Sequence, residues 1–196
     1  MSNKSNKNVV SIRLMSGGHS FSPSSIENIV EQDVQLDVEV VTAKTTLVPS
    51  AMFDKSRATD YLAFVGLAPN ADEVTVFSVE VDDKIAVMAL NKECYSHLVQ
   101  MFGNNLSFTS PIVNDHAPKM GALVELVDSV LYVRIFNGGM LFGEAIHVEN
   151  DADIVYAFET IDRVYHIYNM HVRARGDVNR IMKCCKNCFT DIEIVS

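Results

Sequence analysis

The chain has 196 residues, of which 48% are hydrophobic and 21% are charged, and this composition excludes disorder along most of its length. No run of about 18 apolar residues occurs, so the sequence predicts no transmembrane helix. The formal net charge of −9 opposes non-specific binding to nucleic acid, because that binding depends on neutralising phosphates.

Residues 1–8 are mostly Ser, Asn and Lys. A secretory signal needs an apolar stretch after such a start, and none follows, so we expect a disordered tail and a cytoplasmic protein. Three of the four cysteines lie close together, whereas a disulfide framework would spread them, and this favours a reducing compartment.

Three strands are predicted before the first helix: 9–15, 19–22 and 38–48. The second and third are separated by a polar connection over 23–35. Gly17 and Gly18 predict a turn after the first strand, because glycine accepts positive φ. A small anion nest over this turn is the alternative. Asp54 is a good N-cap and Gly66 a good stop, so a helix is predicted between them.

Residues 74–81 and 84–90 alternate like the two arms of a β-hairpin around Asp82 and Asp83. Asn91 then caps a second helix, which we expect to end near residue 103. The stretch 104–119 contains two prolines and is predicted to connect two lobes.

The second half predicts a three-stranded meander, a long helix, a shorter helix and a last strand: 122–127, 130–136, 140–148, 151–170, 177–186 and 190–195. The first half has a similar plan of strands followed by helices. The sequence therefore predicts an α/β protein with mixed sheets in the ribonuclease-H-like and actin-like layout, with lobes over 9–110 and 120–196.

The C-terminal part contains a basic stretch, defined here as Arg163, Arg173, Arg175, Arg180, Lys183 and Lys186. One interpretation is that it packs on the acidic remainder of the chain. The other is that it docks an acidic partner or lipid head groups, with Arg173, Arg175, Arg180, Lys183 and Lys186 as candidate partner-binding residues.

Short patches in residues 11–62 carry a more specific signal. They are Ser11-Ile12-Arg13-Leu14, His19-Ser20-Phe21-Ser22, Lys44-Thr45-Thr46-Leu47-Val48-Pro49 with Phe53, and Ala58 with Tyr61-Leu62. These patches resemble a bacterial family of domains of unknown function (DUF3822-like), which is similar in fold to actin-like ATPases. The resemblance implies a two-lobed, duplicated fold. The family is longer than this chain, and we expect a second lobe that is reduced after residue 171.

In actin-like ATPases the two lobes hold a nucleotide between hairpins that supply an acidic residue and glycines. The first such hairpin here has Arg13 or Met15 where the resemblance implies the magnesium-side Asp. Glu125 could take the place of the second acid, but Val127, Asp128 and Ser129 replace the glycines. A branched side chain and an extra carboxylate would exclude a triphosphate, so we expect the fold without its ATPase site. Gly17, Gly18, Glu125 and Asp128 remain weak candidates for binding a cofactor.

Cys185 and Cys188 have a spacing that suits zinc, and Cys184, His166 or His171 could complete a site. Because no second cysteine pair follows, buried cysteines are the favoured interpretation, with metal binding and thiol chemistry as alternatives.

Three functions are compatible with these observations. The first is a non-catalytic actin-like module without a cofactor that binds another protein in an assembly or regulatory role, with a homodimer as a candidate state. The second is a divergent nucleotide-binding ATPase that uses Glu125 or Asp128 with magnesium. The third is a metal- or thiol-dependent regulator that uses Cys185 and Cys188.

Overall fold

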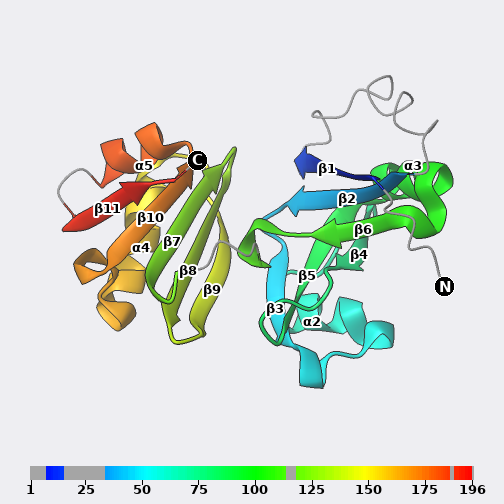
Figure 1. Ribbon diagram of the computed structural model, residues 1–196, viewed down its shortest axis with the longest axis horizontal. Coiled ribbons are helices and arrows are strands. Elements are labelled where there is room, and N and C mark those ends of the chain that lie inside the picture. Colours follow the sequence, from blue (N-terminus) through cyan, green and yellow to red (C-terminus); the bar gives the residue numbers. More distant parts are fainter. Residues whose placement is uncertain (1–7, 16–33, 114–117, 186–187, 196) are drawn as a thin grey trace, which may run out of the picture.

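The computed structural model describes residues 8–15, 34–113, 118–185 and 188–195. Figure 1 shows two lobes side by side, with the first lobe (8–113) on the right and the second lobe (118–195) on the left. Each lobe combines β-sheet with helices that pack against it. The last described element of the first lobe ends at Val113, and the first strand of the second begins at Met120.

One sheet of the first lobe consists of three parallel strands in the order β1-β2-β6: β1 (Asn8–Met15), β2 (Val34–Val41) and β6 (Leu106–Thr109). Its strands alternate, as the pleat requires. Leu36 and Val38 are fully buried on one face. Asp37 and Glu39 therefore lie on the opposite face, and β1 contributes Arg13 to that face, since Arg13 pairs in register with Glu39.

The other sheet of the first lobe is antiparallel, in the order β3-β5-β4: β3 (Thr45–Pro49), β5 (Lys84–Asn91) and β4 (Glu73–Phe77). Helix α2 (Ala58–Phe64) buries Leu62 against it. Helix α3 (Lys92–Phe102) is capped by Asn91, whose side chain accepts hydrogen bonds from the backbone N–H groups of Glu93 and Cys94. Short 3₁₀ turns complete the lobe: η1 (Ser50–Met52), η2 (Lys55–Arg57), η3 (Gly103–Asn105) and η4 (Pro111–Val113).

The second lobe has one five-stranded mixed sheet in the order β11-β10-β7-β8-β9. Its strands are β7 (Met120–Val127), β8 (Val130–Asn137), β9 (Met140–His147), β10 (His171–Gly176) and β11 (Asp191–Ile194). Helices α4 (Asp151–Tyr165) and α5 (Val178–Cys184) flank the turn η5 (Ile167–Asn169) and strand β10. Both helices pack on the same face of the sheet, where Phe158 and Ile181 are fully buried.

The predicted meander, both helices of the first lobe and the hairpin pairing of β4 with β5 are confirmed, with small shifts at their ends. The region 38–48 is two strands, because Thr42 and Lys44 turn the chain between β2 and β3. Residues 78–81 form no strand, apart from one isolated bridge at Val81. The prediction of a strand over 74–81 is therefore wrong in its second half.

Two further expectations are wrong. The stretch 104–119 was predicted to be a connection, but it contains strand β6. This strand forms because the apolar residues Leu106 and Phe108 occupy alternate positions and pack into the core beside α3. The long helix ends at Tyr165, since His166 adopts a left-handed φ of 56°, and β10 follows it. The predicted turn at Gly17 and Gly18 and the predicted strand 19–22 lie outside the described residues.

Candidate functional site

The two lobes share one apolar core at their junction. Residues of β2, β5 and η4 pack there with Val127, Val130 and Tyr132 of the second lobe. The backbone N–H of Thr42 donates to the hydroxyl of Tyr132 at 2.9 Å, and that hydroxyl donates to the carbonyl oxygen of Thr42 at 3.3 Å. Burial raises the pKa of the Tyr132 hydroxyl, so it stays protonated and able to donate.

A cluster of charged side chains lies beside this core. The guanidinium of Arg13 on β1 pairs with Glu39 of the neighbouring strand and, across the junction, with Glu125 of β7 at 3.0 Å. Arg175 of β10 lies 3.9 Å from the second carboxylate oxygen of Glu125. Burial opposes the charge of Arg13, but its hydrogen bond to Glu39 and the charges of both carboxylates outweigh this and raise its pKa.

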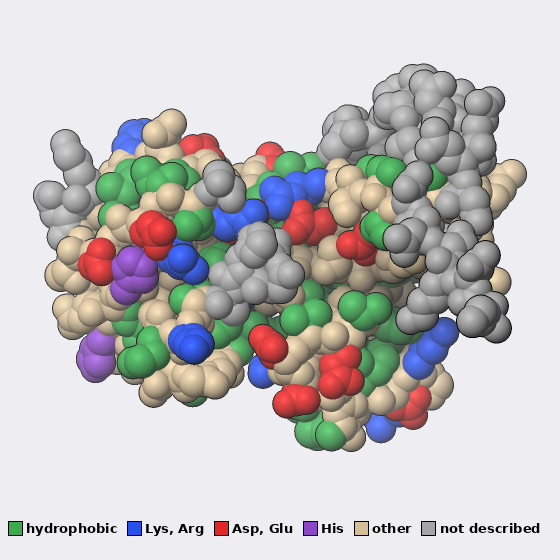
Figure 2. Space-filling model, in the orientation of Figure 1, with side chains coloured by type: hydrophobic (Ala, Val, Ile, Leu, Met, Phe, Trp, Pro, Cys, Tyr) green, Lys and Arg blue, Asp and Glu red, His purple; other side chains and the backbone are tan. Residues whose placement is uncertain are grey.

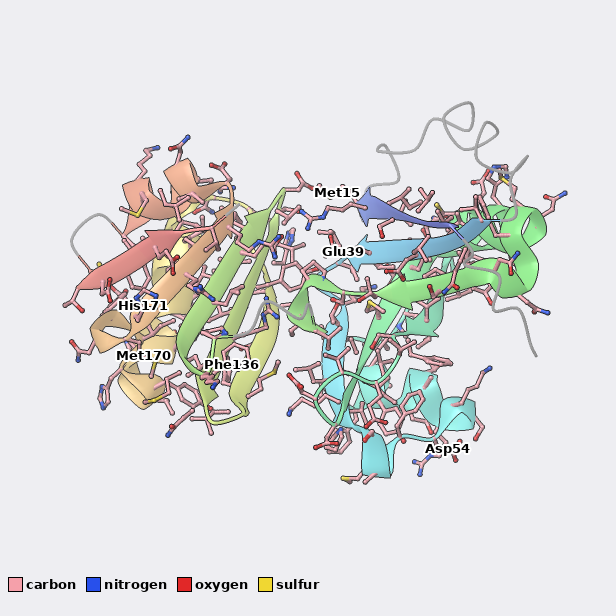
Figure 3. All side chains as sticks on the ribbon, viewed as in Figure 1. Met15, Glu39, Asp54, Phe136, Met170 and His171 are labelled. Carbon is pink, nitrogen blue, oxygen red and sulfur yellow. The ribbon has the colours of Figure 1, made fainter. Side chains whose placement is uncertain are left out.

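Figures 2 and 3 show how this charged cluster lies in the molecule. Basic and acidic side chains gather where the two lobes meet (Figure 2). In Figure 3, Met15 and Glu39 lie at the side of the first lobe that faces the second, whereas His171 lies on the far side of the second lobe. The C-terminal ends of β1 and β2 therefore point toward the junction (Figure 1).

Two cavities border Arg13. The first cavity, of about 470 Å³, lies against the polar face of the parallel sheet and is lined by Ser11, Ile12, Arg13, Asp37, Glu39, Val81, Thr109 and Val113. The second cavity, of about 520 Å³, lies against the second lobe and is lined by Arg13, Glu125, Arg175, Gly176, Asp177, Val178, Asn179, Ile194 and Val195. The Arg13–Glu125 ion pair thus lies at the place where an interlobe ligand would bind.

The candidates Glu125 and Asp128 are not brought together. Glu125 is buried and faces the first lobe, since its neighbour across the strand pair is Tyr132. Asp128 is exposed in the turn between β7 and β8, with a φ of 53°, and does not line the second cavity. An acid–base or magnesium site that uses both carboxylates is therefore incompatible with this geometry. Gly17 and Gly18 lie outside the described residues.

Most of the basic stretch pairs within the second lobe. Arg180 and Lys183 bind the carboxylate of Asp151 at 2.8 and 2.9 Å, and both contacts lower the pKa of that carboxyl. Arg173 pairs with Glu193 at 2.9 Å. Arg175 is the member that reaches the interlobe cluster, and Lys186 lies outside the described residues. Whether the stretch also docks a partner stays a prediction.

The candidate metal ligands do not converge. Cys185 is buried in the core of the second lobe, and burial raises the pKa of its thiol to about 12, which makes it a weak nucleophile. His166 ends α4, and His171 is hydrogen-bonded to Asp191 at 2.7 Å. Across the residues that the structure describes, no three His, Cys, Asp or Glu side chains are grouped so as to hold a metal ion.

Sequence reasoning noticed Arg13 but missed its role, and it missed Tyr132 and Thr42. The available signal was an arginine within an apolar strand, since a charge at such a position needs a partner. Its partner, Glu125, is 112 positions away in the chain. The spacing of the residues could not have shown that pairing.

No family model matches the chain, and no curated protein matches it. A protein of Bacteroides thetaiotaomicron with an actin-like ATPase fold and unknown function is similar over 100% of this chain and 94% of its own, with a TM-score of 0.75 and 13% identity. The cytoplasmic domain of EpsL, an inner membrane component of the type II secretion system of Vibrio cholerae, aligns over 96% of this chain and 85% of its own, with a TM-score of 0.47 and 11% identity.

The first of these similarities shows that the chain has the actin-like ATPase fold, as the sequence predicted. At this level of identity it shows the fold alone. Among the described helices, none has the length and apolar character needed to span a bilayer.

Proposed function

We propose that this chain is a non-catalytic actin-like module that binds another protein in an assembly or regulatory role. The observation that carries the proposal is the state of Glu125. This carboxylate is one of the two acids that line the second cavity, and it is 1% exposed and paired with Arg13. A magnesium ion there would lie beside the guanidinium groups of Arg13 and Arg175, which repel a cation.

The electrostatics of both cavities support the same conclusion. The first cavity is lined by one positive charge, Arg13, and two negative ones, Asp37 and Glu39, and the charges that line the second cavity cancel. A phosphate therefore gains no net attraction in either cavity. The turn after β7 also lacks the glycine that would let backbone N–H groups approach a phosphate.

Thermal unfolding with magnesium-ATP, magnesium-ADP and zinc tests this proposal. A ligand at about 100 times its dissociation constant stabilises a protein by about 2.7 kcal/mol, which corresponds to roughly 5–10 °C for a chain of this size. We expect no shift with either nucleotide.

A nucleotide-dependent shift that disappears in Glu125→Ala and persists in Asp128→Ala would contradict the proposal and favour the divergent ATPase. The second variant is a matched control, because Asp128 is an exposed acid in the same hairpin. A shift with zinc would instead favour the metal-dependent regulator.

A further inference from the structure

The second cavity contains a buried acceptor without a donor. Oε1 of Glu125 accepts the hydrogen bond from Arg13, but Oε2 has no hydrogen-bond partner among the described residues. The Glu125 side chain is only 2% exposed. A buried carboxylate oxygen without a donor is costly, and such groups in native structures call for an explanation.

A buried donor without an acceptor lies opposite it. Nη1 of Arg175 has no hydrogen-bond partner in the described part of the chain, and it lies 3.9 Å from Oε2 of Glu125. This distance is too long for a hydrogen bond between the two atoms. The wall of the cavity therefore holds one unused acceptor and one unused donor, both buried and side by side.

The charges that line the second cavity cancel. Arg13 and Arg175 contribute two positive charges, and Glu125 and Asp177 contribute two negative ones. Asp177 is already committed, because its side chain accepts the hydrogen bond from the backbone N–H of Arg180 that caps α5. Because the lining charges cancel, neither an anion nor a cation is attracted to the cavity as a whole, and an anion is repelled by Glu125 and a cation by Arg175.

We propose that the second cavity binds an uncharged carboxamide, carried by an Asn or Gln side chain of a partner protein. A carboxamide has a carbonyl oxygen and an NH₂ group on the same carbon atom. Its oxygen would accept from Nη1 of Arg175, and its nitrogen would donate to Oε2 of Glu125. This inference rests on the proposed function, since it names the partner group that the interlobe site recognises.

The rim of the cavity favours a protein as the source of this group. Val178, Ile194 and Val195 border it, and the side chain of Ile194 is 67% exposed at the end of the edge strand β11. Protein-binding surfaces combine apolar contacts with a smaller number of direct hydrogen bonds. A partner segment that lies across this rim would cover Ile194 while its carboxamide enters the cavity.

The probe for this proposal is N-acetyl-glutamine-N-methylamide, titrated into the isotope-labelled full chain and followed by backbone amide NMR. N-acetyl-glutamate-N-methylamide is the matched control, because it has the same shape and a negative charge. We expect the glutamine probe to shift the amide signals of Gly176 and Asn179 with millimolar affinity, and the glutamate probe to leave them unchanged. Equal shifts with both probes would overturn the inference.

Two variants test the donor. Arg175→Met removes Nη1, and we expect it to weaken binding of the glutamine probe roughly tenfold or more, as for the loss of a hydrogen bond to a charged group. Arg173→Met is the control, because Arg173 lies on the same strand and sheet face but pairs with Glu193 outside the cavity. Undiminished binding by Arg175→Met would contradict the proposed contact.

The same titration separates this inference from the proposed function. If the glutamine probe causes no shift, an internal water or closure of the ion pair satisfies these atoms, and only the carboxamide site is overturned. If magnesium-ATP shifts the signals of Gly176 and Asn179, the non-catalytic function is overturned as well.

Discussion

The junction between the lobes can be tested by removing the hydroxyl of Tyr132. In Tyr132→Phe, the buried backbone N–H of Thr42 loses its hydrogen-bond partner, whereas the carbonyl of Thr42 keeps the hydrogen bond from the hydroxyl of Thr45. The lost hydrogen bond contributes about 1 kcal/mol, and the buried N–H left without a partner adds about 1–3 kcal/mol. We therefore expect the free energy of unfolding to fall by roughly 2–4 kcal/mol.

The chain offers a matched control for this variant. The hydroxyl of Tyr61 also links two backbone groups, since it accepts from the N–H of Asp54 at 2.9 Å and donates to the carbonyl of Met52 at 2.7 Å. These groups are exposed, so water can replace the hydroxyl in Tyr61→Phe, and the expected cost is below about 1 kcal/mol.

Urea unfolding of the two variants measures this difference. We expect the urea midpoint for Tyr132→Phe to fall well below that for Tyr61→Phe. The slope of the unfolding free energy against urea concentration, which reports the area exposed on unfolding, should not change. Equal costs would refute the reasoning, because burial of the Thr42 backbone would then not matter. A changed slope would show that the lobes separate before they unfold.

Three further variants address local structure in the second lobe. In Gly176→Ala, the new Cβ would collide with the backbone of β7. Gly138 has a similar positive φ but open space around it. We therefore expect Gly176→Ala to be clearly less stable than Gly138→Ala in a thermal melt. Hydrogen bonds from His171 to the carboxylates of Asp191 and Glu193 raise the pKa of His171, so its stabilisation is present below pH about 6.5 and is lost as pH rises through the raised pKa. Urea midpoints at acidic and alkaline pH should therefore differ more for the wild type than for His171→Gln. Asn150→Ala removes both N-cap hydrogen bonds of α4 and should cost about 1 kcal/mol in urea unfolding.

Each of these expectations has a contrary result. Equal stability of the two glycine variants would mean that β7 and β10 can separate without cost. An unchanged pH dependence in His171→Gln would show that its hydrogen bonds to Asp191 and Glu193 do not form in solution. A neutral Asn150→Ala would show that water replaces the cap.

Much of the fold could be predicted from short-range patterns. Asn91 and Asn150 are N-caps because their side chains accept from the first backbone N–H groups of α3 and α4, and this chemistry is local. The meander of β7, β8 and β9 was equally clear, since Asp128 begins a two-residue turn between alternating strands.

Strand β10 was missed although its pattern was present. His171, Arg173 and Arg175 alternate with Val172 and Ala174, which is the period of a half-buried strand. These basic residues were interpreted from their charge, as packing on the acidic remainder of the chain or as docking a partner, and their alternation was not used. Charges at alternate positions of a strand are instead accommodated by carboxylates of neighbouring strands, as Glu193 and Glu125 show.

The candidate site could be predicted only in part. Glu125 was singled out, and it does lie in the interlobe cavity. Its pairing with Arg13 depends on how the two lobes dock, and this is determined by packing between residues far apart in sequence, such as Thr42 and Tyr132. No local pattern specifies that docking.

The claim that the interlobe site is non-catalytic is tested most directly by phosphate release from magnesium-ATP. Purified full-length chain and its Glu125→Ala variant would be assayed side by side, at equal concentration. We expect the wild type to release phosphate no faster than the variant. Release by the wild type that Glu125→Ala abolishes would contradict the non-catalytic function and make Glu125 a catalytic residue.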